Sequence, residues 1–236
     1  MFRSLLVAAT VVALSIPTAL ILIPLAVLTG NVGPLYTVSC AIVRAGFLVA
    51  GIRIRVEGLE RVPAGRACIF MSNHVSNLDP PALIPRIPGR TAAFSKRSIM
   101  KLPALGYAMR LADFIPVDRR GNVESAQQSI AAAKAVLGKG LHITTFVEGT
   151  RSKDGRMLPF KKGPFYLAKE TGAPCIPVSI YGTETLMAKG NAAIHPGTVR
   201  VIFHAPVEPS DFETREELLA AVRTVIASGL PEWMRA

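Results

Sequence analysis

The chain begins with a long segment that water cannot easily solvate. Residues 1–56 contain no acidic side chain, and the run from Leu5 to Leu28 contains no charged residue at all. As a helix this run would extend about 36 Å at ~1.5 Å per residue, compared with ~30 Å for the hydrocarbon core of a bilayer. Pro17 and Pro24 argue against one uninterrupted helix. The segment therefore restricts the fold to one that places an apolar surface in a membrane or buries it.

A second apolar stretch runs from Leu35 to Ile52, after a turn over residues 30–34. A cleaved signal peptide is one interpretation, because Arg3 gives a short positive start. The apolar run is longer than a signal-peptide core, and no small-x-small cleavage site ends it. The pattern favours a retained membrane-associated segment, residues 1–52, followed by a second domain, residues 53–236. It leaves open whether the segment spans the bilayer or dips into one leaflet.

The chain is strongly basic, with 27 Lys and Arg against 16 Asp and Glu and a formal net charge of +11. A basic domain held at a membrane favours anionic lipid surfaces and phosphorylated substrates. No helix-turn-helix, zinc-finger or aromatic RNA-binding signature is present, so nucleic acid is not expected as a partner. Cys40, Cys68 and Cys175 show neither metal-ligand spacing nor a disulfide framework. Reduced thiols indicate a domain that faces the cytosol from the inner, cytoplasmic membrane.

Short strands alternate with helices after residue 52. This order predicts an α/β fold with a mixed, largely parallel central sheet flanked by helices, preceded by the N-terminal apolar helical membrane anchor. The expected strands are Ile52–Glu57, Ala67–Met71, Thr91–Phe94, Phe114–Val117, Leu141–Val147, Cys175–Tyr181 and Val199–His204. The expected helices are Pro80–Ile87, Leu102–Ala112, Val123–Leu137, Gly163–Thr171 and Thr214–Ser228. Polar clusters follow four of the strands, and we expect them to converge on one cleft at the carboxyl ends of the sheet.

His74 and Asp79 form the first of these clusters. Residues five apart do not share a helix face, so the two side chains meet only if the chain turns between them. Ser76 and Asn77 favour such a turn. A carboxylate beside an imidazole makes a general base at neutral pH. The alternative is a lone histidine beside a helix N-cap, Asp79, and these residues alone do not decide between the two.

Another cluster, Glu148–Ser152, has features of an anion site. Gly149 allows a close backbone approach, and Arg151 can hold a phosphate through two parallel hydrogen bonds. The Gly and Lys spacing of a P-loop is missing. The other interpretation is a charged surface turn. The same two interpretations apply to the basic clusters Ser95–Arg97, Arg119–Arg120 and Lys161–Gly163.

Together these segments resemble the glycerolipid acyltransferase (PlsC-like) family, in particular its 1-acyl-glycerol-3-phosphate acyltransferase branch. The resemblance covers about residues 53–205 and rests on blocks in the family's order: Asn73–Asp79 with its common Ser76, Phe114–Arg119, Phe146–Ser152, Phe160–Gly163 and Ala173–Val178. The chain departs from the usual pattern at Val147, where proline is common, and at Asp113 and Pro116 in the second block. Because Asp113 and Pro116 are expected near the acceptor pocket, they leave the acceptor open.

The resemblance implies acyl transfer from acyl-CoA or acyl carrier protein to the sn-2 hydroxyl of 1-acyl-glycerol-3-phosphate, which gives phosphatidic acid. It implies His74 and Asp79 as catalytic residues, and backbone N–H groups after His74 are candidates for an oxyanion site. The implied substrate-binding residues are Ser76, Lys96, Arg119, Glu148, Gly149, Thr150 and Arg151. No metal or redox cofactor is implied, and the expected partners are a phospholipid membrane, a lysophospholipid acceptor and the acyl donor. The alternatives are another acceptor, such as lyso-ornithine lipid or glycerol 3-phosphate, or a non-catalytic membrane lipid-binding protein.

Overall fold

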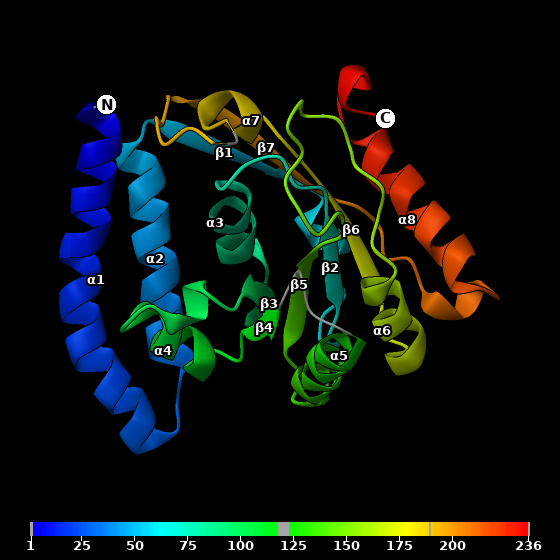
Figure 1. The fold of residues 1–236 in the computed structure, drawn as a ribbon, viewed down its shortest axis with the longest axis horizontal. Helices are drawn as coiled ribbons and strands as arrows, with labels where there is room; N and C mark the ends of the chain where they lie inside the picture. The colour runs from blue at the N-terminus through cyan, green and yellow to red at the C-terminus, as the bar shows by residue number, and fades with distance from the viewer. Residues whose placement is uncertain (1, 118–122, 189, 236) are drawn as a thin grey trace.

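The computed structural model describes residues 2–117, 123–188 and 190–235. Its centre is a seven-stranded sheet in the order β1-β7-β6-β2-β5-β3-β4 (Figure 1). Neighbouring strands are parallel except β6 and β7, which are antiparallel. This confirms the predicted mixed, largely parallel sheet. The strands are β1 Ile52–Glu57, β2 Ile69–Ser72, β3 Thr91–Lys96, β4 Ile115–Val117, β5 His142–Phe146, β6 Cys175–Tyr181 and β7 Gly197–Phe203.

Helices cover both faces of the sheet, in the positions expected from the alternating pattern. The α-helices are α1 Phe2–Thr29, α2 Gly33–Val49, α3 Asp79–Leu83, α4 Leu105–Leu111, α5 Val123–Gly138, α6 Gly163–Thr171, α7 Thr183–Leu186 and α8 Arg215–Ser228. Short 3-10 turns are η1 Leu59–Arg61, η2 Ile84–Arg86, η3 Ile99–Lys101, η4 Pro209–Asp211 and η5 Glu232–Met234. The single turn of α7 was not predicted, because four residues give too short a periodic pattern.

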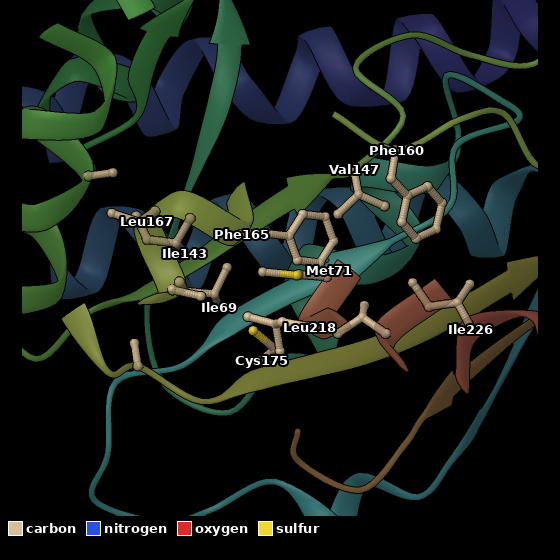
Figure 2. Close-up of a cluster of buried hydrophobic side chains, with 14 of the residues drawn as sticks. Ile69, Met71, Ile143, Val147, Phe160, Phe165, Leu167, Cys175, Leu218 and Ile226 are labelled. Atoms are coloured by element: carbon tan, nitrogen blue, oxygen red, sulfur yellow. The ribbon is translucent and has the colours of Figure 1, made fainter. Parts of the chain in front are cut away.

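The strand β2 lies in the middle of the sheet and is buried on both faces. Ile69 and Met71 point into a core shared with α5, α6 and α8, where Phe165 and Leu218 pack against them (Figure 2). Phe70, between them, points to the opposite core, which α2 and α3 cover. This double burial explains why the strand is continuously apolar and does not alternate with polar residues. It also fixes the position of the residues that follow β2.

The two apolar stretches form a pair of helices, α1 and α2, that pack against each other at one side of the molecule (Figure 1). The expectation of an interrupted first helix is wrong, since α1 continues through Pro17 and Pro24. Each proline removes one hydrogen bond, but its fixed φ is compatible with a helix. Among the described residues α1 is the one helix long and apolar enough to cross a membrane.

The second helix of the pair belongs to the sheet as much as to the anchor. Phe47 of α2, with Ala50 just after the helix, is buried in the core on one face of the sheet. By contrast, Ala26 is the buried residue of α1, whose other side chains stay partly or fully accessible. The division into residues 1–52 and 53–236 stays a prediction. The strand β1 begins at Ile52, one residue before the predicted boundary.

Candidate active site

A cleft of about 1230 Å³ opens at the carboxyl ends of the central strands. His74, which follows β2, lines it together with Lys96 at the end of β3 and Arg151 after β5. Three polar clusters that are far apart in sequence therefore converge, as the strand pattern predicts. The fourth cluster, with Arg119, lies outside the described residues. The rest of the cleft wall is largely apolar and comes from α2, α3, α4, α5 and the start of α6.

His74 and Asp79 meet inside this cleft. The ring Nδ1 lies 2.8 Å from Oδ2 of Asp79, and the Asp79 side chain is fully buried. The same carboxylate accepts hydrogen bonds from the backbone N–H groups of Val75 and Ser76 and from the hydroxyl of Thr183. An ionised carboxylate is acceptor-only, so Nδ1 donates and Nε2 is left as the acceptor. The pair has the tautomer that a general base requires.

The predicted turn at Ser76 and Asn77 is confirmed, because the N–H of Asp79 donates to the carbonyl of Ser76 at 3.3 Å. The alternative role for Asp79 as a helix N-cap is wrong. Asp79 is the first residue of α3, the N-cap is Leu78, and the carboxylate turns back toward the chain before it. Four donors, from His74, Val75, Ser76 and Thr183, lie on that side. These four donors give the Asp79 carboxylate more hydrogen bonds than the N–H groups at the start of a helix would.

The segment after β5 holds His74 from the other side. Phe146 stacks on the imidazole with ring centroids 4.2 Å apart. The N–H of Ser152 donates to the carbonyl of His74 at 2.8 Å, and the N–H of Val147 donates to the carbonyl of Ser72 at 3.0 Å. These contacts extend the pairing of β2 and β5 beyond the ends of both strands. The candidate base and the candidate anion site are therefore parts of one rigid unit.

Positive charge gathers around the mouth of this unit. Lys96, Gly149, Thr150 and Arg151 all line the cleft, and so does Lys161. Gly149 has a φ of +71°, and a Cβ there would lie 3.1 Å from Cγ of Lys161. The glycine therefore leaves space for the Lys161 stem to cross the turn. The sequence left Lys161 open between a solvated charge and an anion contact, and the structure places it in the cleft.

Comparisons with known proteins cover the segment that contains this site. A family model described as Acyltransferase matches residues 53–181, more than half of the chain and all three converging clusters. The chain belongs to the acyltransferase family. The family assignment confirms the resemblance seen in the His-x4-Asp block and the blocks after it.

Named relatives of this acyltransferase-family chain share one description. It is 39% identical over 158 residues to a chloroplastic 1-acyl-sn-glycerol-3-phosphate acyltransferase of Brassica napus, covering 64% of this chain and 44% of the relative. It is 30% identical over 189 residues to the human alpha form, covering 76% of this chain and 67% of the relative. The chain thus spans less than half of the Brassica protein's length.

A solved structure extends the similarity to nearly the whole chain. The crystal structure of the 1-acyl-sn-glycerophosphate (LPA) acyltransferase PlsC from Thermotoga maritima superposes with a TM-score of 0.84 at 28% identity. The match covers 98% of this chain and 95% of that chain. The similarity therefore includes the N-terminal helices as well as the acyltransferase-family domain.

Glu148, in the family's third block, has a different place from the one predicted. Its side chain is buried, Oε1 accepts the N–H of His74 at 3.0 Å, and Oε2 accepts the N–H of Leu158 at 3.1 Å. It is not among the residues that line the cleft. The prediction that Glu148 contacts substrate is corrected to a positioning role, in which the carboxylate ties His74 to the loop before α6. Burial raises the pKa of Glu148 to about 7, although both N–H donors oppose the rise.

The raised pKa of Glu148 predicts that the unfolding free energy of the wild type depends on pH in a way that the Glu148→Gln variant does not share. Between about pH 4.5 and pH 7 the unfolded chain has lost the Glu148 proton and the folded chain keeps it, so rising pH favours unfolding. Relative to the variant, the wild type should lose about 3 kcal/mol of unfolding free energy across this window. Denaturant unfolding of both proteins at pH 4.5 and pH 7.5 measures this difference. A difference that does not change with pH would show that Glu148 titrates normally.

Ser76 is also displaced from its predicted role. Its side chain is fully buried, Oγ donates to the carbonyl of Met187 at 2.7 Å, and the same atom accepts the N–H of Leu78 at 3.2 Å. With both interactions made inside the protein, Ser76 holds the turn and does not reach the substrate. The backbone N–H groups of His74, Val75, Ser76 and Leu78 are likewise bonded internally. The expected oxyanion site at this turn is therefore not formed by these four groups.

Asp113, a departure from the family pattern, does not itself line the cleft, although its neighbours Ala112 and Phe114 do. Its φ is +63°, a conformation that Asp tolerates better than most residues. Its carboxylate pairs with Arg90 at 3.3 Å and with Lys139 at 2.6 Å, near the amino ends of the strands. Pro116, the second departure, is exposed and does not line the cleft. Val117, beside Pro116, does line the cleft, so the expectation that the two residues lie near the acceptor pocket stays a prediction.

Two buried cysteines do not provide a competing nucleophile. Burial raises the pKa of Cys68 to about 11 and that of Cys175 to about 12, so both stay protonated at neutral pH. A thiol without its thiolate is a poor nucleophile. Among the described residues, no cluster of three or more His, Cys, Asp or Glu side chains is arranged to hold a metal ion.

Proposed function

We propose that this protein transfers a fatty acyl group from a thioester to the sn-2 hydroxyl of 1-acyl-glycerol-3-phosphate. The observation that carries the proposal is the His74–Asp79 pair, which lies in a largely apolar cleft with three cationic side chains near its mouth. Such a cleft suits an acceptor that has an acyl chain, a free hydroxyl and a phosphate. The name that the relatives share supports this acceptor.

The reaction needs one base and no protein nucleophile. Nε2 of His74 takes the proton of the acceptor hydroxyl as the oxygen attacks the thioester carbonyl carbon, and Asp79 stabilises the imidazolium. The C–S bond then breaks, and the departing thiolate takes a proton back from the imidazolium. A thiol with a reference pKa of ~8.5 leaves with little acid assistance. The step balances without a metal or a redox cofactor, and the donor is acyl-CoA or acyl carrier protein.

The acceptor phosphate binds the cationic side chains of the cleft. Arg151 makes two parallel hydrogen bonds to it, and Lys96 and Lys161 approach from the other sides. Gly149 and Thr150 bring the backbone close to the phosphate oxygens. Arg119 is a further candidate from the sequence, outside the described residues. The domain lies on the cytosolic side of the inner membrane, where α1 and α2 hold it at the leaflet that contains the acceptor.

An acceptor panel tests this function. The purified full chain receives acyl-CoA and one acceptor at a time: lysophosphatidate, glycerol 3-phosphate, lyso-ornithine lipid or another lysophospholipid. Free thiol is measured as it is released. We expect turnover with lysophosphatidate to exceed the others. Turnover with a phosphate-free acceptor alone would favour the ornithine lipid, and liposome binding without thiol release would favour a lipid-binding protein.

Lys161 and Lys162 offer a matched pair of variants. Lys161 lines the cleft, whereas its neighbour Lys162 pairs with Glu216 at 3.2 Å on the exposed side. A charge-assisted hydrogen bond contributes roughly 1.5–3 kcal/mol, so Lys161→Ala should raise the acceptor KM about 10- to 100-fold. Lys162→Ala should leave it within about twofold, because exposed ion pairs contribute little. Equal effects of Lys161→Ala and Lys162→Ala on the acceptor KM, or an effect of Lys161→Ala on the donor KM alone, would show that Lys161 does not bind the acceptor phosphate.

A further inference from the structure

The segment from the last residue of β3 into α4, residues 96–110, borders the mouth of the cleft, and we call it the lip. Lys96 and Ile99 border the cleft, as do Leu105 and Ala108. On its other side α4 contacts α1, the apolar helix (Figure 1). The lip therefore lies between the candidate membrane anchor and the entrance to the candidate active site.

The lip is one of the few places outside the first two helices where large apolar side chains are exposed. Ile99, Leu102, Leu105 and Tyr107 are 42%, 50%, 52% and 41% exposed. Of all large hydrophobic side chains exposed in the described part of the chain, only three lie outside α1, α2 and the lip: Leu59, Tyr166 and Trp233. The lip thus continues the apolar surface of the anchor onto the catalytic domain. Exposed apolar surface concentrated in one area marks an interaction site.

The exposure belongs to a folded element. Met100 is buried, and its carbonyl accepts a hydrogen bond from the Arg110 guanidinium at 2.6 Å. Gly106 packs so closely that a Cβ there would lie 2.2 Å from the same carbonyl. The N–H of Gly106 also donates to the carbonyl of Leu102. These contacts hold Leu102 and Leu105 outward, although their burial elsewhere would be more favourable in water.

The charge of the lip has one sign. No acidic residue occurs between Asp79 and Asp113, whereas six basic residues do. Four of them, Lys96, Arg97, Lys101 and Arg110, are exposed on the lip. Apolar side chains interleaved with Lys and Arg are typical of surfaces that lie in the interface of an anionic membrane.

We propose that the lip is a second membrane-docking surface, which inserts Leu102 and Leu105 into an anionic leaflet beside α1. Arg97 and Lys101 bind the lipid headgroups, so the cleft mouth opens directly onto the lipid. An acidic protein is the other occupant that this charge would suit. Membrane is favoured because the lip is continuous with α1, whose exposed side chains are nearly all apolar, and a protein partner would leave that continuity unexplained.

The chain has a single tryptophan, Trp233, which makes a direct test possible. In a Trp233→Phe background, Leu102→Trp places a fluorescent probe on the lip. Leu59→Trp places a control probe on η1, which follows the carboxyl end of β1. Because β1 runs opposite to β2, this control lies at the other end of the sheet from the cleft. Vesicles of phosphatidylglycerol and phosphatidylcholine with brominated acyl chains should quench the Leu102→Trp emission and shift it to the blue. The Leu59→Trp emission should not change. No quenching of the Leu102→Trp probe would overturn the proposal, whether or not the protein transfers acyl groups.

Acyl-transfer turnover gives a second test of the lip, and this test rests on the proposed function. One leucine removed from hydrocarbon is worth roughly a 10-fold or larger change in partition, and each basic residue at an anionic leaflet is worth ~5-fold. Leu102→Glu and Arg97→Gln/Lys101→Gln should therefore lose at least about 10-fold of their turnover on lysophosphatidate in anionic vesicles. Both should keep near-normal turnover on a short-chain, monomeric lysophosphatidate. Lys153→Gln/Arg156→Gln, on the loop beside Trp233, is the control and should behave as wild type.

Two outcomes of the turnover arm would contradict the lip as a membrane surface. Equal losses on vesicles and on the monomeric acceptor would place the lip in the catalytic machinery or in folding. A loss that appears only with acyl carrier protein as donor, in the absence of vesicles, would make the lip a surface for that acidic protein. No turnover by the wild type on any acceptor would reject the proposed function and leave the fluorescence result valid.

Discussion

The His74→Ala variant should lose acyl transfer by about 10²- to 10⁴-fold, because general-base catalysis contributes that much when no protein nucleophile takes part. The fold should survive, since the backbone bonds of His74 do not need its side chain and Asp79 keeps its bonds to Val75, Ser76 and Thr183. The loss should appear in kcat, with the KM values for donor and acceptor little changed. Thiol release from acyl-CoA, measured against acceptor concentration, separates these constants.

His195→Ala is a suitable control for this experiment. His195 is exposed and does not line the cleft, so its removal should leave turnover unchanged. Vesicle binding by His74→Ala should equal that of the wild type, because α1, α2 and the lip are untouched. Near-normal turnover by His74→Ala would reject the proposed chemistry and revive the lipid-binding alternative.

Asp79→Asn should have an effect of similar size on activity and a larger one on stability. An amide oxygen in the place of Oδ2 is a weaker, uncharged acceptor for Nδ1 and the two backbone N–H groups, and the amide NH2 cannot accept from Thr183. In the serine-protease triad the same change lowers kcat about 10⁴-fold. Disrupting a buried charged network typically costs about 3 kcal/mol. Kinetics and thermal unfolding on the same sample measure both effects.

A second variant keeps the Asp79 experiment interpretable if Asp79→Asn fails to fold. Thr183→Val removes one donor from the other carboxylate oxygen and leaves the bond to His74 in place. We expect about a 10-fold loss of kcat, because Asp79 is less firmly held. Full activity in Thr183→Val and in a folded Asp79→Asn protein would show that His74 acts without its carboxylate partner.

Most of the fold was predictable because its elements have strong local patterns. The seven strands and the five longer helices of the catalytic domain were all expected, with boundaries that differ by a few residues. The start of α4 was placed three residues too early, since Leu102 looks like a helical residue although it belongs to an exposed turn. Leu105 is the actual first residue of that helix. The short helix α7 has no periodic signal of its own and was missed.

The site was predictable only in part, for a different reason. Residue type and spacing identified His74 and Asp79, since the turn between them is local. They did not reveal Thr183, which is 104 residues from Asp79 in sequence and donates to its carboxylate. They also assigned Ser76 and Glu148 to the substrate, because hydroxyl and carboxylate groups look alike whether they face a cleft or the backbone. The direction of each side chain depends on how β2, β5 and β6 pair.

The apolar N-terminal segment shows the same division. Its sequence alone determined that these residues form helices with an apolar surface, because composition fixes how each side chain partitions between water and lipid. Only the tertiary structure decided that α1 stays largely exposed, that Phe47 at the end of α2 joins the sheet core, and that the lip extends the apolar surface to the cleft. Hydrophobicity is a property of each residue, whereas exposure is a property of what packs against it.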